Sequence, residues 1–365
     1  MVDSAEGDIN KTKDLISVVV RFHDPEKLPQ LDEALFSLSC QTYSKIQVIL
    51  VVQRNTQMDE SFLNALKLLI AKQPFEDPAI HKAAYVDIPN GMDGRSELLN
   101  QGIKLADGQY LAFLDYDDVV YNQSYELLID RIRDSKFPVA VGGCILATQE
   151  RITDDANREH PTNNYDGNPG HLYTVSKRPY LEPGSAKTKL DLIAANFIPI
   201  HTFVLDRTQI DPTLLKFNTS LKCYEDYEVL LKLASKYEFD FKLLDTPLVE
   251  YRIRNDGSNT IPTHEASPQV RQQWEESKRY IENLKTNMMI QVNAKDLSDL
   301  VKSHDRLAAE RKTLTFQIAA IWYSLTEAWT PIKKLKRLGF SGIAFTAKKL
   351  RSIRIFFFRC VRYND

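Results

Sequence analysis

The chain has 365 residues, of which 43% are hydrophobic, 26% charged and 10% aromatic. This composition is ordinary for a globular protein and excludes disordered, collagen-like and disulfide-scaffold classes. No apolar run approaches the roughly 18–20 residues of a membrane-spanning helix, the polar N-terminus is unlike a secretory signal, and four scattered cysteines form no CxxC motif. We therefore expect a soluble cytoplasmic protein of two domains, or of one domain with an appendage.

The net charge of -2 hides two regions of opposite sign. Residues 331–365 carry ten Lys and Arg and one acid, which leaves 37 basic and 48 acidic residues in residues 1–330. The body is therefore -11 and the C-terminal segment +9. A segment this basic requires an anionic partner or surface.

The first 250 residues alternate apolar, β-branched runs with segments of helical periodicity. Helices are expected at residues 31–38, 62–70 and 96–106. Strands are expected at Leu15–Arg21, Ile46–Val52, Ala83–Ile88 and Tyr110–Leu114. The alternation predicts an α/β fold with a mixed, mainly parallel sheet flanked by helices. In such sheets, ligands bind at the C-terminal ends of the strands.

The alternation of strand-like and helix-like segments becomes less regular after Leu146. Residues 150–185 are rich in Asn, Asp, Pro and Gly and are expected to form a long loop or lid. Structure is expected to resume at Phe197–Leu205, and the elements after it are a helix at Asp226–Ser235 and two strands at Phe239–Leu244 and Leu248–Ile253.

Only helices are expected beyond Pro262. Leu300, Leu307, Leu314 and Ile321 recur every seven residues. This spacing fits a homo-oligomer formed by a coiled coil through residues 297–325, and it fits equally a helix packed along the main domain.

Three carboxylates directly follow the strand predicted at Tyr110–Leu114, namely Asp115, Asp117 and Asp118. Partly buried carboxylates repel each other, and a divalent cation with oxygen ligands would remove that penalty. Such a cation could also stabilise a diphosphate leaving group. An Asp-rich turn without a ligand is an equally good interpretation of these residues alone.

Two further segments contain candidate catalytic or binding residues. Glu225 and Asp226 open a predicted helix, where acids cap the first turn or where one of them acts as a general base. Gly91–Gly94 with Arg95 forms a Gly-rich turn that lacks the spacing of known phosphate loops. His201, in an apolar run, is expected to be a packed residue rather than a metal ligand.

The order of these motifs along the chain resembles the order of motifs in the family 2 glycosyltransferases. The segment from Gly94 to Ile103 and the sequence ADGQYLAFLDYDD at residues 106–118 are similar to the family's R/N-x-G-I helix and its A-x-G-x-Y-I-x-F-L-D-x-D-D pattern. ALFSL with QTY at residues 34–43, CYEDY at 223–227 and VEYR at 249–252 look like the first helix, the E-D motif and the closing Y-R. The resemblance spans roughly Leu15 to Asn259.

The resemblance implies a GT-A (Rossmann-like) domain at residues 15–260, in which a nucleotide-binding half and an acceptor half share one sheet. A flexible N-terminus (1–14) would precede it, and a helical extension (261–330) and a basic amphipathic tail (331–365) would follow it. The implied reaction is the inverting, metal-dependent transfer of a sugar from a nucleotide-diphosphate sugar to an acceptor hydroxyl.

The resemblance also assigns roles to individual residues. Asp226 would be the catalytic base, with Glu225 beside it. Mg²⁺ or Mn²⁺ would be held by Asp115 and Asp117, with Asp118 alongside. The nucleotide sugar would be bound by Arg21, Gln53, Arg95, Asn100, Asp115, Asp117 and Arg254.

Three segments depart from the family pattern. The usual D-D-G-S is replaced by Gln53-Arg54-Asn55-Thr56, which puts recognition of the base in question. Arg21-Phe22-His23-Asp24 stands in place of P-x-Y-N, close to an R-T-K-D variant. Where many members have Tyr-Arg-x-His, this chain has Arg254, so a His metal ligand is missing there. Arg254 is a candidate to contact the phosphates and reduce reliance on metal.

The segment 331–362 interleaves Lys and Arg with Leu, Ile and Phe. This pattern is typical of a helix in an anionic membrane interface, although a helix covering the acidic body and nucleic-acid binding are alternatives. We expect a membrane surface and no nucleic acid. The resulting hypothesis is a peripheral enzyme of the inner membrane face that builds surface polysaccharide on a saccharide or lipid-linked saccharide. A catalytically inactive GT-A module that docks a polysaccharide assembly complex is the alternative.

Overall fold

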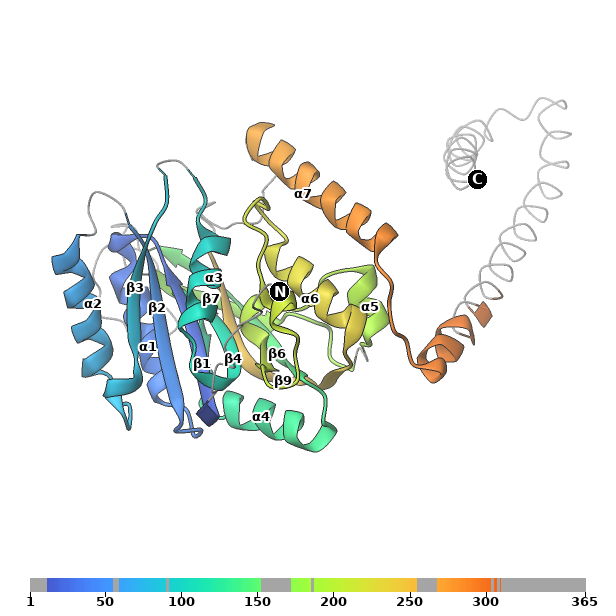
Figure 1. The fold of residues 1–365 in the computed structure, drawn as a ribbon, viewed down its shortest axis with the longest axis horizontal. Coiled ribbons are helices and arrows are strands. Elements are labelled where there is room, and N and C mark those ends of the chain that lie inside the picture. Colours follow the sequence, from blue (N-terminus) through green and yellow to red (C-terminus); the bar gives the residue numbers. More distant parts are fainter. Residues whose placement is uncertain are drawn as a thin grey trace, which may run out of the picture. The chain divides into compact units, whose positions relative to one another are not determined.

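The computed structural model describes residues 12–54, 59–89, 92–151, 172–184, 187–254, 268–302, 305–306 and 309. The chain divides into two compact units, Met1–Gln291 and Val292–Asp365. All strands and helices labelled in Figure 1 belong to the first unit. In the second unit, residues 294–302 are helical. The predicted tail at 331–365 and Leu307, Leu314 and Ile321 of the heptad pattern lie outside the described residues.

Nine strands in the described part of the chain form one mixed sheet. Its first half has the order β3-β2-β1-β4, with all neighbours parallel. These strands are β1 (Thr12–Phe22), β2 (Ile46–Arg54), β3 (Lys82–Asp87) and β4 (Gly108–Asp115). The helices between them are α1 (Leu28–Ser39), α2 (Glu60–Lys72) and α3 (Arg95–Leu105). The short η1 (Pro25–Lys27) precedes α1, and the short η2 (Pro78–Ile80) lies between α2 and β3. The predicted alternation is confirmed in this half.

The second half of the sheet continues from β4 in the order β8-β6-β9-β5, with β7 paired to β6. These strands are β5 (Val119–Val120), β6 (Val139–Arg151), β7 (Leu172–Pro179), β8 (Phe203–Asp206) and β9 (Phe239–Arg254). The β6–β9 pair is parallel, and the other pairs of this half are antiparallel. The helices are α4 (Ser124–Ser135), α5 (Lys189–Ala194), α6 (Glu225–Lys236), α7 (Pro268–Asn287) and the short η3 (Ile200–Thr202) and η4 (Pro212–Leu215).

Two expectations for the second half were wrong. The segment at 150–185 was expected to be a loop, yet its described residues include β7, which pairs with β6 in an antiparallel ladder. The two strands expected at Phe239–Leu244 and Leu248–Ile253 are one continuous strand, β9. Its pairing register with β6 shifts opposite Gly142 and Gly143, and this irregularity lets one strand continue through Pro247.

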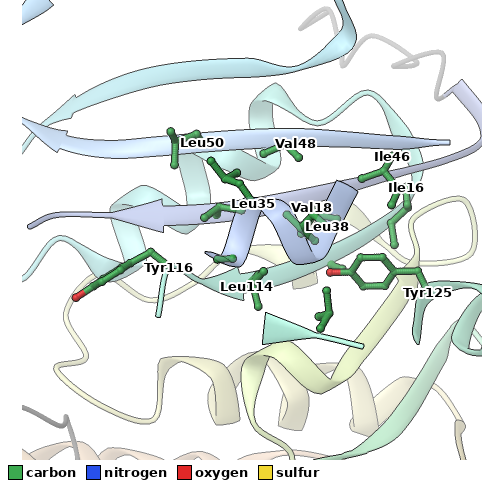
Figure 2. Close-up of a cluster of buried hydrophobic side chains, with 14 of the residues drawn as sticks. Ile16, Val18, Leu35, Leu38, Ile46, Val48, Leu50, Leu114, Tyr116 and Tyr125 are labelled. Carbon is green, nitrogen blue, oxygen red and sulfur yellow. The ribbon is translucent and has the colours of Figure 1, made fainter. Parts of the chain in front are cut away.

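Helices cover both faces of the sheet, which explains why the central runs Val18–Val20 of β1 and Val48–Val52 of β2 are continuously apolar instead of alternating. Val18 and Val20 face a core made with α1, α2 and α4, whereas Val19 faces a second core made with α3, α5, α6 and α7. Figure 2 shows Leu35 and Leu38 of α1 together with Val18 and Leu50 in the first core. The sheet therefore holds the ends of its central strands rigidly in place.

Helix α3 lies so close to β1 that only glycine fits at the contact. A Cβ added to Gly102 would lie 2.2 Å from Cγ1 and 2.8 Å from Cγ2 of Val19, whose side chain is fully buried.

We predict that Gly102→Ala lowers the free energy of unfolding by about 1–3 kcal/mol, the usual cost of overpacking a core. Chemical denaturation of the variant would measure this loss. Adding Val19→Ala to Gly102→Ala should cost less than the sum of the two single changes, because the smaller side chain makes room. Strictly additive losses would contradict this packing.

Candidate functional site

An arginine at the end of β1 joins the two halves of the sheet domain. Arg21 is the register partner of Asp115 at the end of β4. Its Nε donates to Oδ1 of Asp115, its Nη2 donates to Oδ2 at 2.9 Å, and its Nη1 lies 3.3 Å from Oε1 of Glu225. The Arg21, Asp115 and Glu225 side chains are 11%, 23% and 8% exposed. The guanidinium therefore links the D-x-D turn to helix α6.

The electrostatics of this link follow from burial and charge. Burial raises the pKa of Asp115, but the charge and hydrogen bonds of Arg21 outweigh burial and bring that pKa below its usual value. Burial lowers the pKa of Arg21, and the two carboxylates more than compensate and raise it. Arg21 and Asp115 are thus both held in their charged forms at neutral pH.

The second carboxylate of the turn pairs with a different arginine. Nη2 of Arg254, the last residue of β9, lies 2.8 Å from Oδ2 of Asp117. Burial, followed by the charges of Asp118 and Asp115, raises the pKa of Asp117 to about 7. The expectation that Arg254 lies in the site is consistent with this contact, which places the guanidinium directly on the D-x-D motif.

The third carboxylate, Asp118, is almost fully buried. Its Oδ1 accepts a hydrogen bond of 2.8 Å from the backbone N–H of Arg252. Its Oδ2 lies 3.1 Å from Nδ1 of His201, which is 3% exposed and packs against the ring of Tyr251. Burial lowers the pKa of His201, but Asp118 and Cys144 raise it well above the usual value.

These groups are chemically suited to a divalent cation. One ligand atom each from Asp115, Asp118 and His201 lie within 4.8 Å of one another. Carboxylate oxygens and imidazole nitrogens are common ligands of divalent metals in proteins. The described residues thus contain a group that could hold a metal ion, although its members differ from the three aspartates expected from the sequence.

Helix α6 presents the proposed base. Tyr224 precedes the helix in a left-handed conformation (φ 64°), and Glu225 and Asp226 form its first turn. The ring of Trp274 in α7 lies 5.2 Å from that of Tyr224. Asp226 is partly buried, and Oδ1 of its carboxylate accepts from the N–H of Tyr227 at 2.6 Å. Burial, together with the Glu225 charge, raises the pKa of Asp226 to about 7.

The other residues predicted to bind the nucleotide sugar differ in their contacts and in how they are placed relative to the carboxylate turn. Arg95 begins α3, pairs with Asp93 at 2.6 Å and donates to the carbonyl of Lys222, so it reaches the loop before α6. Gln53 ends β2 beside Gly94. Asn100 is different, because its amide exchanges two hydrogen bonds with the backbone of Phe217.

The structure therefore brings together the carboxylates of Asp115, Asp117 and Asp118 with their cationic partners, next to Glu225. Among the described residues, no hydrogen bond or ion pair joins Gln53 or Asn100 to these carboxylates. His201 is buried as expected, but it also lies against Asp118, which the sequence analysis did not foresee. A lone ionisable residue in an apolar run is the one signal for such a contact, because burying it requires a polar partner.

Comparisons with known proteins match the part of the chain that contains the D-x-D turn. Residues 17–188 match the model of the family described as Glycosyl transferase family 2. The D-x-D turn lies within this match, and so do the C-terminal half of β1 and all of β2 to β7. This part of the chain is similar to glycosyl transferase family 2, and the family match and the mixed sheet confirm the α/β, GT-A fold class.

Several relatives are similar over part of their length. The chain is 29% identical over 143 residues to "Uncharacterized glycosyltransferase EpsJ" of Bacillus subtilis, which is 38% of this chain and 36% of EpsJ. It is 23% identical over 287 residues to "Minor teichoic acid biosynthesis protein GgaB" of the same organism, which is 76% of this chain and 26% of GgaB. The chain thus matches little more than a third of one relative and about a quarter of the other.

A solved structure is also similar. The crystal structure of Staphylococcus aureus TarS 1-349 in complex with UDP has a TM-score of 0.48 and 16% sequence identity, with 76% of this chain and 67% of that chain covered.

The link through Arg21 leads to a stability prediction. We expect Arg21→Met to lower the free energy of unfolding by about 3–5 kcal/mol at pH 7, because it leaves two mostly buried carboxylates without their partner. Arg54→Met is a matched control at the end of the neighbouring strand, where Arg54 is 44% exposed and pairs with surface carboxylates. That control should cost at most about 1 kcal/mol.

The pH dependence gives a second readout of the same variant. The pKa of Asp115 is lowered in the folded protein, so the pair stabilises the fold above the unfolded pKa of about 3.9. This stabilisation is lost as the pH falls through the lower folded value. The difference between wild type and Arg21→Met should therefore shrink in thermal unfolding at acidic pH. A difference that is constant with pH would contradict the assignment.

Proposed function

We propose that the protein is an inverting glycosyltransferase that moves a sugar from a nucleotide-diphosphate sugar to a hydroxyl group of a saccharide acceptor. The observation that carries this proposal is the Arg21 bridge, which joins the D-x-D turn of the family-matched region to Glu225, the first of the two acids that open α6. It connects a charged edge suited to a diphosphate with the helix turn whose second acid, Asp226, is suited to take up a proton.

The donor would bind at the C-terminal edge of β1 and β4, the usual ligand position in such sheets. Arg95 and Arg254 supply positive charge there, and guanidinium groups bind phosphates through paired hydrogen bonds. Mg²⁺ or Mn²⁺ at the Asp115, Asp117 and Asp118 turn would neutralise charge that develops on the leaving diphosphate. Gln53 at the end of β2 would lie towards the nucleoside.

Asp226 would act as the general base. As the acceptor oxygen forms its bond to the anomeric carbon, the bond from that carbon to the diphosphate oxygen breaks, and the nucleoside diphosphate leaves with the electron pair. Asp226 takes the proton of the acceptor hydroxyl. A single displacement of this kind needs one base and no protein nucleophile, and it inverts the configuration at the anomeric carbon.

The biological setting is proposed from the relatives. GgaB is named a minor teichoic acid biosynthesis protein, which supports a role in making a bacterial surface polymer on a saccharide or lipid-linked acceptor. No helix among the described residues is long and apolar enough to cross a membrane. We propose that the basic segment 331–365 attaches the enzyme to the anionic inner face of the membrane, and that residues 297–325 can join two copies.

A donor-binding experiment tests the proposal. We predict that one of UDP, GDP, dTDP or CMP, tested with Mn²⁺ and with EDTA, raises the melting temperature of the full-length protein. A micromolar ligand at millimolar concentration should add about 4 kcal/mol of stability. Asp115→Asn should lose the shift, whereas Asp134→Asn, an exposed carboxylate on α4, should keep it. The absence of a shift with every nucleotide would favour the catalytically inactive module.

The raised pKa of Asp226 predicts the pH dependence of transfer. The rate should rise with pH and level off above about 7, because the base must lose its proton to act. Glu225→Gln removes the neighbouring charge that helps to raise this pKa and should move the midpoint to lower pH. Asp226→Asn should lower the turnover number by about 10²–10⁴. Turnover of Asp226→Asn at the wild-type rate would exclude Asp226 as the base.

Asp226→Asn should also change the stability of the folded protein, in the direction opposite to that expected for Arg21→Met. A carboxyl whose folded pKa is raised destabilises the protein once the pH exceeds the unfolded value of about 3.9. Asp226→Asn should therefore melt at a higher temperature than wild type at pH 8, and the difference should shrink towards pH 4. A lower melting temperature of the variant at pH 8 would contradict the burial of this charge.

A further inference from the structure

Helix α7, drawn in orange in Figure 1, lies beyond the family-matched residues 17–188 and packs against the turn that carries the proposed base. Trp274, Ser277 and Ile281 recur at helical spacing and form its inner face. Ser277 and Ile281 are 3% and 2% exposed, and Ile281 belongs to the second core. This face is therefore fixed to the sheet domain, where the sequence predicted only the start of a helical extension.

Four side chains of α7 contact residues of the segment 223–228, which contains both acids of α6. Ser277 interacts with the thiol of Cys223, the ring of Trp274 lies 5.2 Å from that of Tyr224, Nζ of Lys285 lies 5.2 Å from the ring centroid of Tyr227, and the hydroxyl of Tyr280 donates to Oε1 of Glu228 at 3.5 Å. None of these four contacts involves Asp226. Through them, α7 acts on the proposed base by way of the backbone of the turn.

Tyr224 has a backbone conformation that a large side chain disfavours. Its φ of 64° and ψ of 17° lie in the left-handed region. Among the described residues, the other non-glycine residues with positive φ are Asp14 and Lys136, and Lys136 ends α4, where this conformation is common. The Tyr224 side chain makes no capping hydrogen bond to α6. Such a conformation persists only where the surrounding structure imposes it.

The contacts of the Tyr224 ring account for this conformation. The ring meets that of Trp274 edge to face, with an angle of 66° between the planes, and lies 6.4 Å from the ring of Tyr227. Aromatic pairs attract each other in this geometry. Because the φ of Tyr224 sets the direction in which the chain enters α6, a fixed ring also fixes the direction in which Asp226 points.

From these contacts we infer that Trp274 is a positioning residue, which holds Tyr224 in the left-handed conformation and thereby orients the carboxylate of Asp226. Its part in catalysis rests on the proposed function, whereas its hold on the turn can be tested separately. Without the Trp274 ring, Tyr224 returns to an ordinary negative φ and the first turn of α6 rotates. Tyr224→Gly removes the need for this hold, because glycine adopts a positive φ without strain.

The first test measures donor hydrolysis by the full-length protein at pH 8, with UDP-glucose, GDP-mannose and dTDP-glucose as probes and water as the acceptor. Trp274→Ala should lower kcat by about 5–30-fold, the factor by which relief of left-handed strain favours the relaxed turn. The KM for the donor should change little. Tyr224→Gly added to Trp274→Ala should restore most of the lost rate, and Trp274→Phe should retain most of it. Arg279→Ala, at an exposed position of α7, is the control and should have no effect.

The second test uses melting temperatures at pH 8 and needs no activity. Asp226→Asn is expected to raise the melting temperature of the otherwise wild-type protein, because burial and the Glu225 charge disfavour the ionised carboxylate. In the Trp274→Ala background this gain should disappear, since the rotated turn exposes the carboxylate to water. The gain should return when Tyr224→Gly is added.

Two results would overturn the inference. A wild-type kcat in Trp274→Ala, or an undiminished gain from Asp226→Asn in that background, would show that the turn keeps its form without Trp274. A loss of rate that Tyr224→Gly does not restore would show that Trp274 acts by another route, such as direct contact with a substrate. If the wild-type protein hydrolyses none of the probes, that failure concerns the proposed function, and the melting temperatures alone decide whether Trp274 positions Asp226.

Discussion

The arrangement of the site depends on one buried arginine that is shared by two carboxylates. Arg21 forms a two-point contact with Asp115 and reaches Glu225 on α6, so one guanidinium connects the ends of β1 and β4 to the helix that carries the proposed base. Charges this poorly hydrated are tolerated only when they are paired. Removing the arginine would therefore disturb both the carboxylate turn and the first turn of α6.

The need to pair buried charges also explains the contacts of the other two carboxylates of the turn. Asp115 pairs with Arg21, Asp117 with Arg254 and Asp118 with His201, and the three partners come from β1, β9 and η3. Three carboxylates within four positions would otherwise repel each other at the end of a buried strand. Because each partner comes from a different element, the turn takes its final form only when both halves of the sheet have assembled around it.

Local pattern was sufficient to predict the first half of the domain and the location of the carboxylates. Apolar runs such as Ile46–Val52 are long and bounded by clear helices, and the aspartates directly follow such a run. Features that depend on distant pairing were not predictable. The strand β7 is stabilised by its ladder with β6, and β9 continues past Pro247 because β6 changes register beside it. Asn100 was assigned to the nucleotide because the motif contains it, but its amide is bonded to the backbone of Phe217, 117 residues away. His201 meets Asp118 only through the fold.

The most direct test of this account is a double-mutant cycle between Arg21 and Glu225, measured as the free energy of unfolding of wild type, Arg21→Met, Glu225→Gln and the double variant. Groups that interact across a mostly buried pair show coupling energies of about 0.5–3 kcal/mol. We predict a favourable coupling of at least about 1 kcal/mol between β1 and α6. Losses that add within about 0.3 kcal/mol would show that the two residues act independently, and the guanidinium could then no longer be regarded as the link between the carboxylate turn and the proposed base.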